Sequence, residues 1–180
     1  TSRLGSAAAW NVGLANARGR TLFFCDSSIQ FIPFWRELHL EHLEQWPDIG
    51  LVSSVSISGQ GAQRFSGGSE EQSLPGLARG LFESWRGQHS YVANFGSPVM
   101  MARMQVVERV GGFDVRFSDG GLEFVDWYQR VRLAGSRLRV AQDCLMGWAT
   151  PAVSDGSKDS WRALNEKWGT QVVYSEEGFE

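Results

Sequence analysis

The order of apolar and polar positions along the chain predicts alternating helices and strands. Alanines and leucines at helical spacing predict a helix over residues 3–17, and the unbroken apolar run TLFFC predicts a strand over 21–25. Because that run does not alternate, we expect a strand buried on both faces, as in a parallel sheet. One apolar stripe predicts a helix over 35–46, and IGLVSSVSI predicts a strand over 49–57. This order indicates an α/β protein with helices layered on a sheet.

The second half of the chain begins with a long aperiodic segment. Residues 58–76 are rich in Gly and Ser and have no hydrophobic period, which predicts a long loop. The elements predicted after this loop are a helix over 77–86, a strand over 97–102, a short helix ending at Val110, a helix over 121–134, a strand over 137–142 and a helix over 160–168. We expect residues 1–180 to form a single domain.

Composition narrows the class of protein. A chain of 180 residues that is 42% hydrophobic can bury a sizeable core, and a net charge of −3 gives no global reason to expect nucleic acid as a partner. Cys25 and Cys144 lie far apart without metal-binding spacing, so we expect neither a disulfide framework nor structural zinc. The sequence also lacks an apolar run near the roughly 20 residues of a transmembrane helix. We expect a cytoplasmic protein.

The helix predicted over 121–134 carries two stripes. Its apolar stripe consists of Phe124, Trp127, Tyr128 and Val131. Its polar stripe consists of Glu123, Asp126 and Arg130, and spacing alone favours a solvated face whose Asp126–Arg130 pair contributes about 0.2–0.5 kcal/mol. The position of the two carboxylates favours chemistry instead, because a helix start that follows the Gly-rich SDGG can present a general base or bind a sugar hydroxyl. Both interpretations stay open on spacing alone.

Two segments together resemble a known enzyme family. VGGFDVRFSDGGLEFVDWYQRVRLAG, at 110–135, resembles the acceptor-site signature of family 2 glycosyltransferases, vGgFDe followed by gEDvDlxxRxxxaG. GSAAAWNVGLANARGRTLFFCDSS, at 5–28, is similar to that family's aarNxGixxAxGexixflDxD, and NEKWG at 165–169 resembles a frequent family ending. The resemblance covers most of the chain. It implies an α/β fold of the GT-A type, in which helices flank a mixed sheet.

The resemblance assigns the donor side of a site to three residues. Asp26 and Ser28 stand at the two acidic positions of the family's DxD motif, which binds the nucleotide ribose and a divalent cation, Mn²⁺ or Mg²⁺, on the diphosphate. Ser28 offers only a neutral oxygen, so we expect a weak metal site on Asp26. Asn11 is expected to orient the donor side of the cleft. On the residues alone, the alternative is that Asp26 is only a polar residue that ends a strand.

The chain also departs from the family pattern at two positions. Phe124 stands where the family has the aspartate that takes the proton from the acceptor hydroxyl, and phenylalanine cannot accept a proton. Trp148 stands at or near the position of a metal-binding histidine. If the chain is an enzyme, Glu123 or Asp126 replaces the base, and only one of them can point at the acceptor.

The resemblance therefore supports two hypotheses. The first is an inverting glycosyltransferase that moves a sugar from a nucleotide-sugar donor to a hydroxyl of a glycan or other acceptor. The alternative is a non-catalytic GT-A-like module that binds a glycan, a nucleotide or a protein partner. The family's leading nucleotide-binding strands have no counterpart before Thr1, so we expect a partial domain. Its open sheet edge is expected to pair with a missing N-terminal segment, another partner or a second copy.

Overall fold

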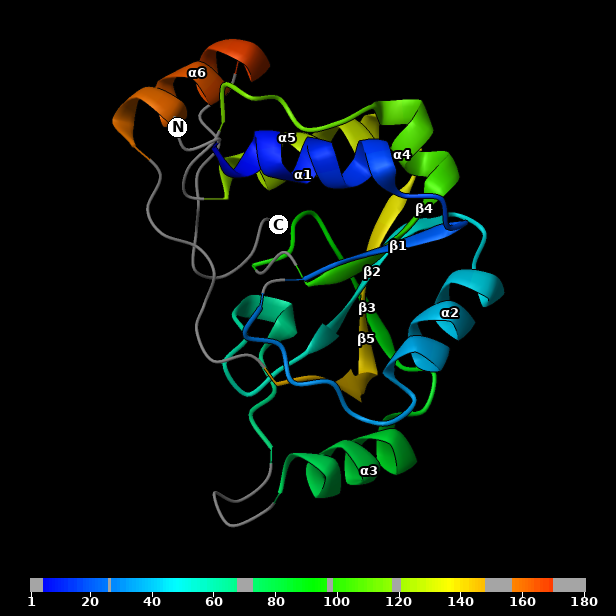
Figure 1. The fold of residues 1–180 in the computed structure, drawn as a ribbon. Coiled ribbons are helices and arrows are strands. Elements are labelled where there is room, and N and C mark those ends of the chain that lie inside the picture. Colours follow the sequence, from blue (N-terminus) through cyan, green and yellow to red (C-terminus); the bar gives the residue numbers. More distant parts are fainter. Residues whose placement is uncertain are drawn as a thin grey trace.

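The computed structural model describes residues 5–25, 27–67, 73–96, 99–117, 121–147 and 157–169. Helices and strands alternate through most of this part of the chain, as Figure 1 shows. The elements are α1 (Ser6–Asn16), β1 (Thr21–Phe24), α2 (Trp35–Gln45), β2 (Ile49–Val55), a 3₁₀ turn (Gly61–Gln63), α3 (Leu74–Trp85), β3 (His89–Val92), β4 (Met100–Arg103), α4 (Met104–Val110), α5 (Leu122–Leu133), β5 (Arg137–Leu145) and α6 (Lys158–Trp168).

The five strands form one mixed sheet in the order β1-β4-β2-β5-β3. β2 and β5 are parallel, whereas β4 is antiparallel to both of its neighbours and β3 is antiparallel to β5. All seven residues of β2 are buried, which fits its central place. The predicted α/β architecture with a mixed sheet is confirmed.

β1 differs from its prediction. It lies at the end of the strand order and pairs antiparallel with β4, and Phe24 is its one fully buried residue. The prediction of a fully buried parallel strand is therefore wrong, although apolar side chains do pack on both faces of β1. The run is unbroken because Leu22 packs against the core on one face of the sheet while Phe23 packs against the core on the other. Among the described residues no strand covers the outer edge of β1.

Helices cover both faces of the sheet. α1, α4 and α5 lie together on one face, and α2 lies on the opposite face (Figure 1). On the first face, rings from three elements interlock: Trp10 of α1 lies 5.5 Å from Phe124 of α5, and Phe24 of β1 lies 5.6 Å from Trp127 of α5, centroid to centroid. This aromatic cluster brings the end of β1 next to the first turns of α5.

Two parts of the prediction missed local structure. β3 was not predicted, because its four residues HSYV are too short and too polar to carry a strand pattern. The predicted loop over 58–76 contains the 3₁₀ turn and the start of α3, where Ser73 Oγ accepts a hydrogen bond from the Gly76 N–H at 3.4 Å. Residues 68–72 of that loop and 97–98 of the predicted strand lie outside the described residues.

Two further features bear on the type of protein. Within the described ranges, none of the helices has both the length and the apolar character needed to cross a bilayer. Cys25 and Cys144 are both free cysteines. Cytoplasmic localisation and the single-domain organisation stay predictions.

Candidate functional site

The first turns of α5 are buried between the sheet and α6. Glu123 is 2% exposed and Asp126 is fully buried, so the interpretation of a solvated polar face is wrong. The physical reason is a second apolar contact: Leu122 and Val125 pack against Leu164 of α6, while the aromatic stripe packs against the sheet. α5 therefore presents carboxylates inside the protein at its N-terminal end.

Asp126 is engaged through both carboxylate oxygens. Its Oδ2 accepts a hydrogen bond from Arg130 Nε at 3.0 Å. Its Oδ1 accepts a hydrogen bond from Trp168 Nε1 at 3.1 Å and lies 2.7 Å from Lys167 Nζ. Two cations and an indole thus compensate one buried negative charge, as burial of a carboxylate requires. In this arrangement both oxygens of Asp126 are already bound by neighbouring side chains.

Side chains from α5 also hold the loop that follows α4. Arg130 Nη1 donates to the Val110 carbonyl at 2.6 Å, and its Nη2 donates to the Gly112 carbonyl at 2.8 Å. Trp127 Nε1 donates to the Gly111 carbonyl at 3.0 Å. Three successive carbonyls of this loop therefore have side-chain donors, which fixes its path next to the start of α5.

Asn11 of α1 also holds this loop, through two hydrogen bonds to Phe113 that we call the clasp. Its Oδ1 accepts a hydrogen bond from the Phe113 N–H at 2.7 Å, and its Nδ2 donates to the Phe113 carbonyl at 2.8 Å. A Cβ at Gly112 would collide with Asn11 Oδ1, so glycine is the residue that allows this close approach. The structure places Asn11 against the loop over 110–114, and its role toward a donor stays a prediction.

Asp114 ends the loop and connects it to α6. Its Oδ2 lies 2.7 Å from Arg116 Nη2 and 2.9 Å from Lys167 Nζ. The hydrogen bonds from Arg116, together with those from Lys167, hold the pKa of Asp114 well below its usual range although burial acts in the opposite direction. The lowered pKa keeps Asp114 ionised at neutral pH, and Lys167 contacts this carboxylate as well as that of Asp126.

Glu123 and Phe124 occupy adjacent positions with different surroundings. Phe124 points into the aromatic cluster, with its ring 4.9 Å from that of Phe113, so the position of the family's base belongs to the core. Glu123 lies in the first turn of α5, where the helix dipole favours a carboxylate. The catalytic role of Glu123 is untested by this geometry.

The opposite side of the candidate site lies beyond the end of β1. Asp26 is outside the described residues, as is Trp148. Ser28 is partly exposed, and the next segment pairs with the residue that follows β5, since Gln30 N–H donates to the Gly147 carbonyl at 2.7 Å. The chain after β1 thus lies beside the chain after β5. That Asp26 and Glu123 converge on one cleft stays a prediction.

The described residues do not supply a metal site. No group of three or more His, Cys, Asp or Glu side chains lies close enough to hold a metal ion in this part of the chain. Ser28 alone does not fit Mn²⁺ or Mg²⁺, which prefer several oxygen ligands with carboxylates among them.

A second buried polar cluster lies under α2, and sequence reasoning missed it. His42 Nε2 lies 2.7 Å from Asp143 Oδ1, and Asp143 Oδ2 accepts a hydrogen bond from the Gly87 N–H at 2.7 Å. Arg139 is fully buried, with its guanidinium carbon 3.4 Å from the centroid of the Trp46 ring. His42 and Asp143 stand 101 positions apart, so no local pattern could indicate the pair.

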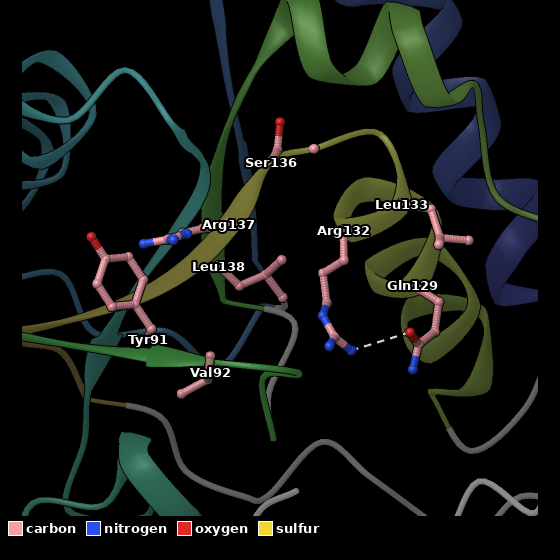
Figure 2. A pocket seen from close by; sticks show the side chains of 9 residues that line it. Tyr91, Val92, Gln129, Arg132, Leu133, Ser136, Arg137 and Leu138 are labelled. Carbon is pink, nitrogen blue, oxygen red and sulfur yellow. Dashed lines mark hydrogen bonds between the residues drawn. The ribbon is translucent and has the colours of Figure 1, made fainter. Parts of the chain in front are cut away.

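An open groove of about 540 Å³ lies at the other end of α5. Figure 2 shows it between the last turns of α5, which carry Gln129 and Arg132, and the strands β3 and β5. Arg137 also lines it but forms an ion pair with Asp48 at 3.5 Å. Because this groove adjoins the C-terminal end of α5, it is separate from the region around Glu123.

Comparison with known proteins identifies the fold. No family model and no curated protein sequence matches the chain. The fold is similar to the crystal structure of GalNAc-T7 with UDP, GalNAc and Mn²⁺, at a TM-score of 0.65 and 12% identity over 91% of this chain and 35% of that one.

Two further solved structures give the same result. Mannosyltransferase PcManGT from Pyrobaculum calidifontis, in complex with GDP-Man and Mn²⁺, is similar at a TM-score of 0.54 and 20% identity over 92% of this chain and 41% of that one. S. aureus TarS is similar at a TM-score of 0.56 and 17% identity, over 97% of this chain and 29% of TarS. The chain thus spans less than half the length of each structure. The predicted GT-A-like fold is confirmed, and membership of family 2 stays a prediction.

Proposed function

We propose that this chain belongs to an inverting glycosyltransferase, which moves a sugar from a nucleotide-sugar donor to a hydroxyl of a glycan or other acceptor. The observation that carries the proposal is the likeness of the fold to glycosyltransferases solved with UDP or GDP-mannose. A second observation supports it: the aromatic contacts of Phe24 bring the end of β1 beside the first turns of α5. These are the two places to which the family resemblance assigns donor and acceptor chemistry.

We assign the general base to Glu123. Phe124 is part of the core, and Asp126 binds Arg130 and Lys167 inside the protein. Glu123 is the acidic residue in the first turn of α5, at the position that matches the glutamate of the family signature. In the proposed step, Glu123 takes the proton of the acceptor hydroxyl while that oxygen bonds to the anomeric carbon. The bond to the nucleotide diphosphate breaks, and its electron pair leaves with the diphosphate. A single displacement of this kind inverts the anomeric centre.

The donor side is assigned to the segment that follows β1. Asp26 and Ser28 are proposed to contact the ribose or diphosphate, and Asn11 to act through the loop that it clasps. A divalent cation, when bound, would neutralise charge on the departing diphosphate. Because the described residues do not form a metal site, no step is assigned to the cation, and Asp26 remains the proposed ligand.

The second candidate is a non-catalytic module that binds a nucleotide, a glycan or a protein. One observation favours it: the position that the family resemblance assigns to the base is a core phenylalanine. Under this alternative the fold is retained and the chain binds without turnover.

A transfer assay separates the two candidates. The chain is incubated with a panel of nucleotide sugars, with and without Mn²⁺, and release of nucleoside diphosphate is measured. We expect turnover by the wild type and by Glu44→Gln, a matched change at an exposed carboxylate of α2, and its loss in Glu123→Gln. Binding without turnover supports the module. Absence of binding to every nucleotide at millimolar concentration contradicts the enzyme.

A further inference from the structure

The C-terminal end of α6 meets the acidic end of α5 at one buried carboxylate. Lys167 and Trp168, the last two residues of α6, both contact Oδ1 of Asp126, at 2.7 Å and 3.1 Å. Arg130 holds the other oxygen from within α5. In Figure 1, α6 lies across the N-terminal end of α5. Asp126 therefore makes the polar contacts that hold the C-terminal end of α6 against α5.

Lys167 links Asp126 to the loop before α5. Its Nζ lies 2.9 Å from Asp114 Oδ2 as well as 2.7 Å from Asp126 Oδ1. The same ammonium lies 5.3 Å from the centroid of the Phe117 ring, a position that favours a cation. One side chain of α6 thus ties together the two segments that flank the start of α5.

Apolar packing adds a second attachment around Glu123. Leu164 of α6 is fully buried and forms one cluster with Leu122, Val125 and Phe117. Leu122 directly precedes Glu123, and Val125 follows it by two positions. α6 therefore contacts the helix immediately before Glu123 and one turn after it, at Asp126.

We infer that α6 positions Glu123, and that Lys167, Trp168 and Asp126 are positioning residues for the reaction at Glu123. This inference rests on the proposed function, since it concerns the base assigned there. A base works only within about 2.6–3.2 Å of the hydroxyl, and a displacement near 1 Å can cost about 100-fold in rate. Asp126, one of the two carboxylates that the sequence offers as a base, therefore acts by holding the helix that carries the other.

The test compares three single variants in the full chain. Lys167→Met removes both ion pairs, and Lys167→Arg keeps a cation at this position. Arg116→Met removes a cation that forms an ion pair with Asp114 and leaves the two ion pairs of Lys167 in place. Three quantities are measured: kcat and KM for transfer, hydrogen-exchange protection of α6 amides, and the ¹³C resonance of the Glu123 carboxyl group.

The inference predicts a specific split. In Lys167→Met, α6 amides lose protection, the Glu123 resonance shifts, and kcat falls by about tenfold or more while KM for the donor stays near the wild-type value. Lys167→Arg restores most of the rate, and Arg116→Met leaves the rate close to that of the wild type.

Two results overturn the inference. Equal losses of kcat in Lys167→Met and Arg116→Met would indicate a general effect of charge. Loss of α6 protection with an unchanged Glu123 resonance and unchanged kcat would show that α6 does not position this residue. If the wild type turns over no donor, the proposed function fails, and the Glu123 resonance then decides the inference alone: a shift in Lys167→Met supports the coupling, and no shift overturns it.

Discussion

Two buried polar clusters on opposite faces of the sheet differ in how completely their groups are paired. In the cluster between α5 and α6, Asp126 and Arg130 each make several polar contacts that hold a loop and two helices together. In the cluster under α2, the guanidinium nitrogens of Arg139 and Nδ1 of His42 have no hydrogen-bond partner among the described residues.

The difference teaches what each cluster does. A carboxylate with three donors fixes geometry, because moving any one partner leaves a charge uncompensated. A buried arginine stacked on Trp46 is held mainly by the face of the indole ring, and it fixes no other segment through hydrogen bonds. The α5–α6 cluster is therefore the one that can position a reactive group, and the cluster under α2 fastens one helix to the sheet.

The largest effect is expected from substitution of Asp126, the carboxylate at the centre of the α5–α6 cluster. Asp126→Ala leaves Arg130 and Lys167 without their shared carboxylate, and we expect the free energy of unfolding to fall by about 3 kcal/mol. Urea denaturation measures this loss. The matched control is Asp159→Ala, whose carboxylate is 89% exposed and whose removal should change stability by less than about 0.5 kcal/mol. A loss below about 1 kcal/mol for Asp126→Ala would remove the contrast between the clusters.

The second effect is a pH dependence from His39, a fully buried histidine of α2. Burial lowers the pKa of His39 from its ordinary 6.5 to about 4, although a hydrogen bond to the Trp35 carbonyl acts in the opposite direction. The unfolded chain therefore binds a proton in the range from about pH 6.5 to about pH 4 that the folded chain does not, so stability falls as the pH falls through that range.

We expect this residue to account for about 2–3 kcal/mol between pH 7 and pH 4. The measurement is the urea midpoint of unfolding as a function of pH. His39→Phe keeps an aromatic ring beside Trp35 and should flatten this part of the profile. An unchanged profile in that variant would assign the acid sensitivity to other groups.

The third effect tests the clasp at the loop over 110–114. Asn11→Ala removes two hydrogen bonds to Phe113, and we expect a loss of about 2 kcal/mol together with faster hydrogen exchange at the Phe113 amide. Asn16→Ala is the control, because its side chain donates one exposed hydrogen bond within α1. Equal effects of the two substitutions would mean that the clasp adds nothing to an ordinary helix contact.

The smallest effect is expected from substitution of Arg139, which we compare with substitution of Arg130. Arg139→Met removes a buried cation that makes no hydrogen bond among the described residues, so we expect a change within about 1 kcal/mol, of either sign. Arg130→Met removes three hydrogen bonds and should cost about 2 kcal/mol more. Thermal unfolding of both variants at one pH measures the two losses of stability. A larger loss of stability in Arg139→Met than in Arg130→Met would contradict the contrast between the two clusters.

Elements with a strong pattern could be predicted from the sequence. α5 and β1 were found near their observed bounds, because their apolar residues repeat at helical spacing or form an unbroken run. β3 could not be found, since its register depends on pairing with β5, where Tyr91 lies opposite Arg139. No strand within the described ranges pairs with the outer edge of β1, and both the partial domain and the partner expected at this edge stay predictions.

The residues of the candidate site could be named from the sequence, whereas their contacts could not, and their roles stay predictions. Glu123, Asp126 and Arg130 have the same helical spacing whether their face meets water or another helix. What distinguishes them is α6, whose Trp168 reaches Asp126 across 42 positions of sequence. Asn11 likewise meets Phe113 across 102 positions. Such contacts arise from the packed fold, so the sequence could mark Asp126 and Asn11 as candidates without showing which distant residues they contact.

The most direct test of the central claim is a crystal structure of the chain with a nucleoside diphosphate and an acceptor analogue bound. We predict a Glu123 carboxylate oxygen within about 2.6–3.2 Å of the acceptor hydroxyl, the diphosphate at the end of β1, and Asp126 still bonded to Arg130 and Lys167. An acceptor bound away from the first turn of α5, or Asp126 turned toward the hydroxyl in place of Glu123, would contradict the account.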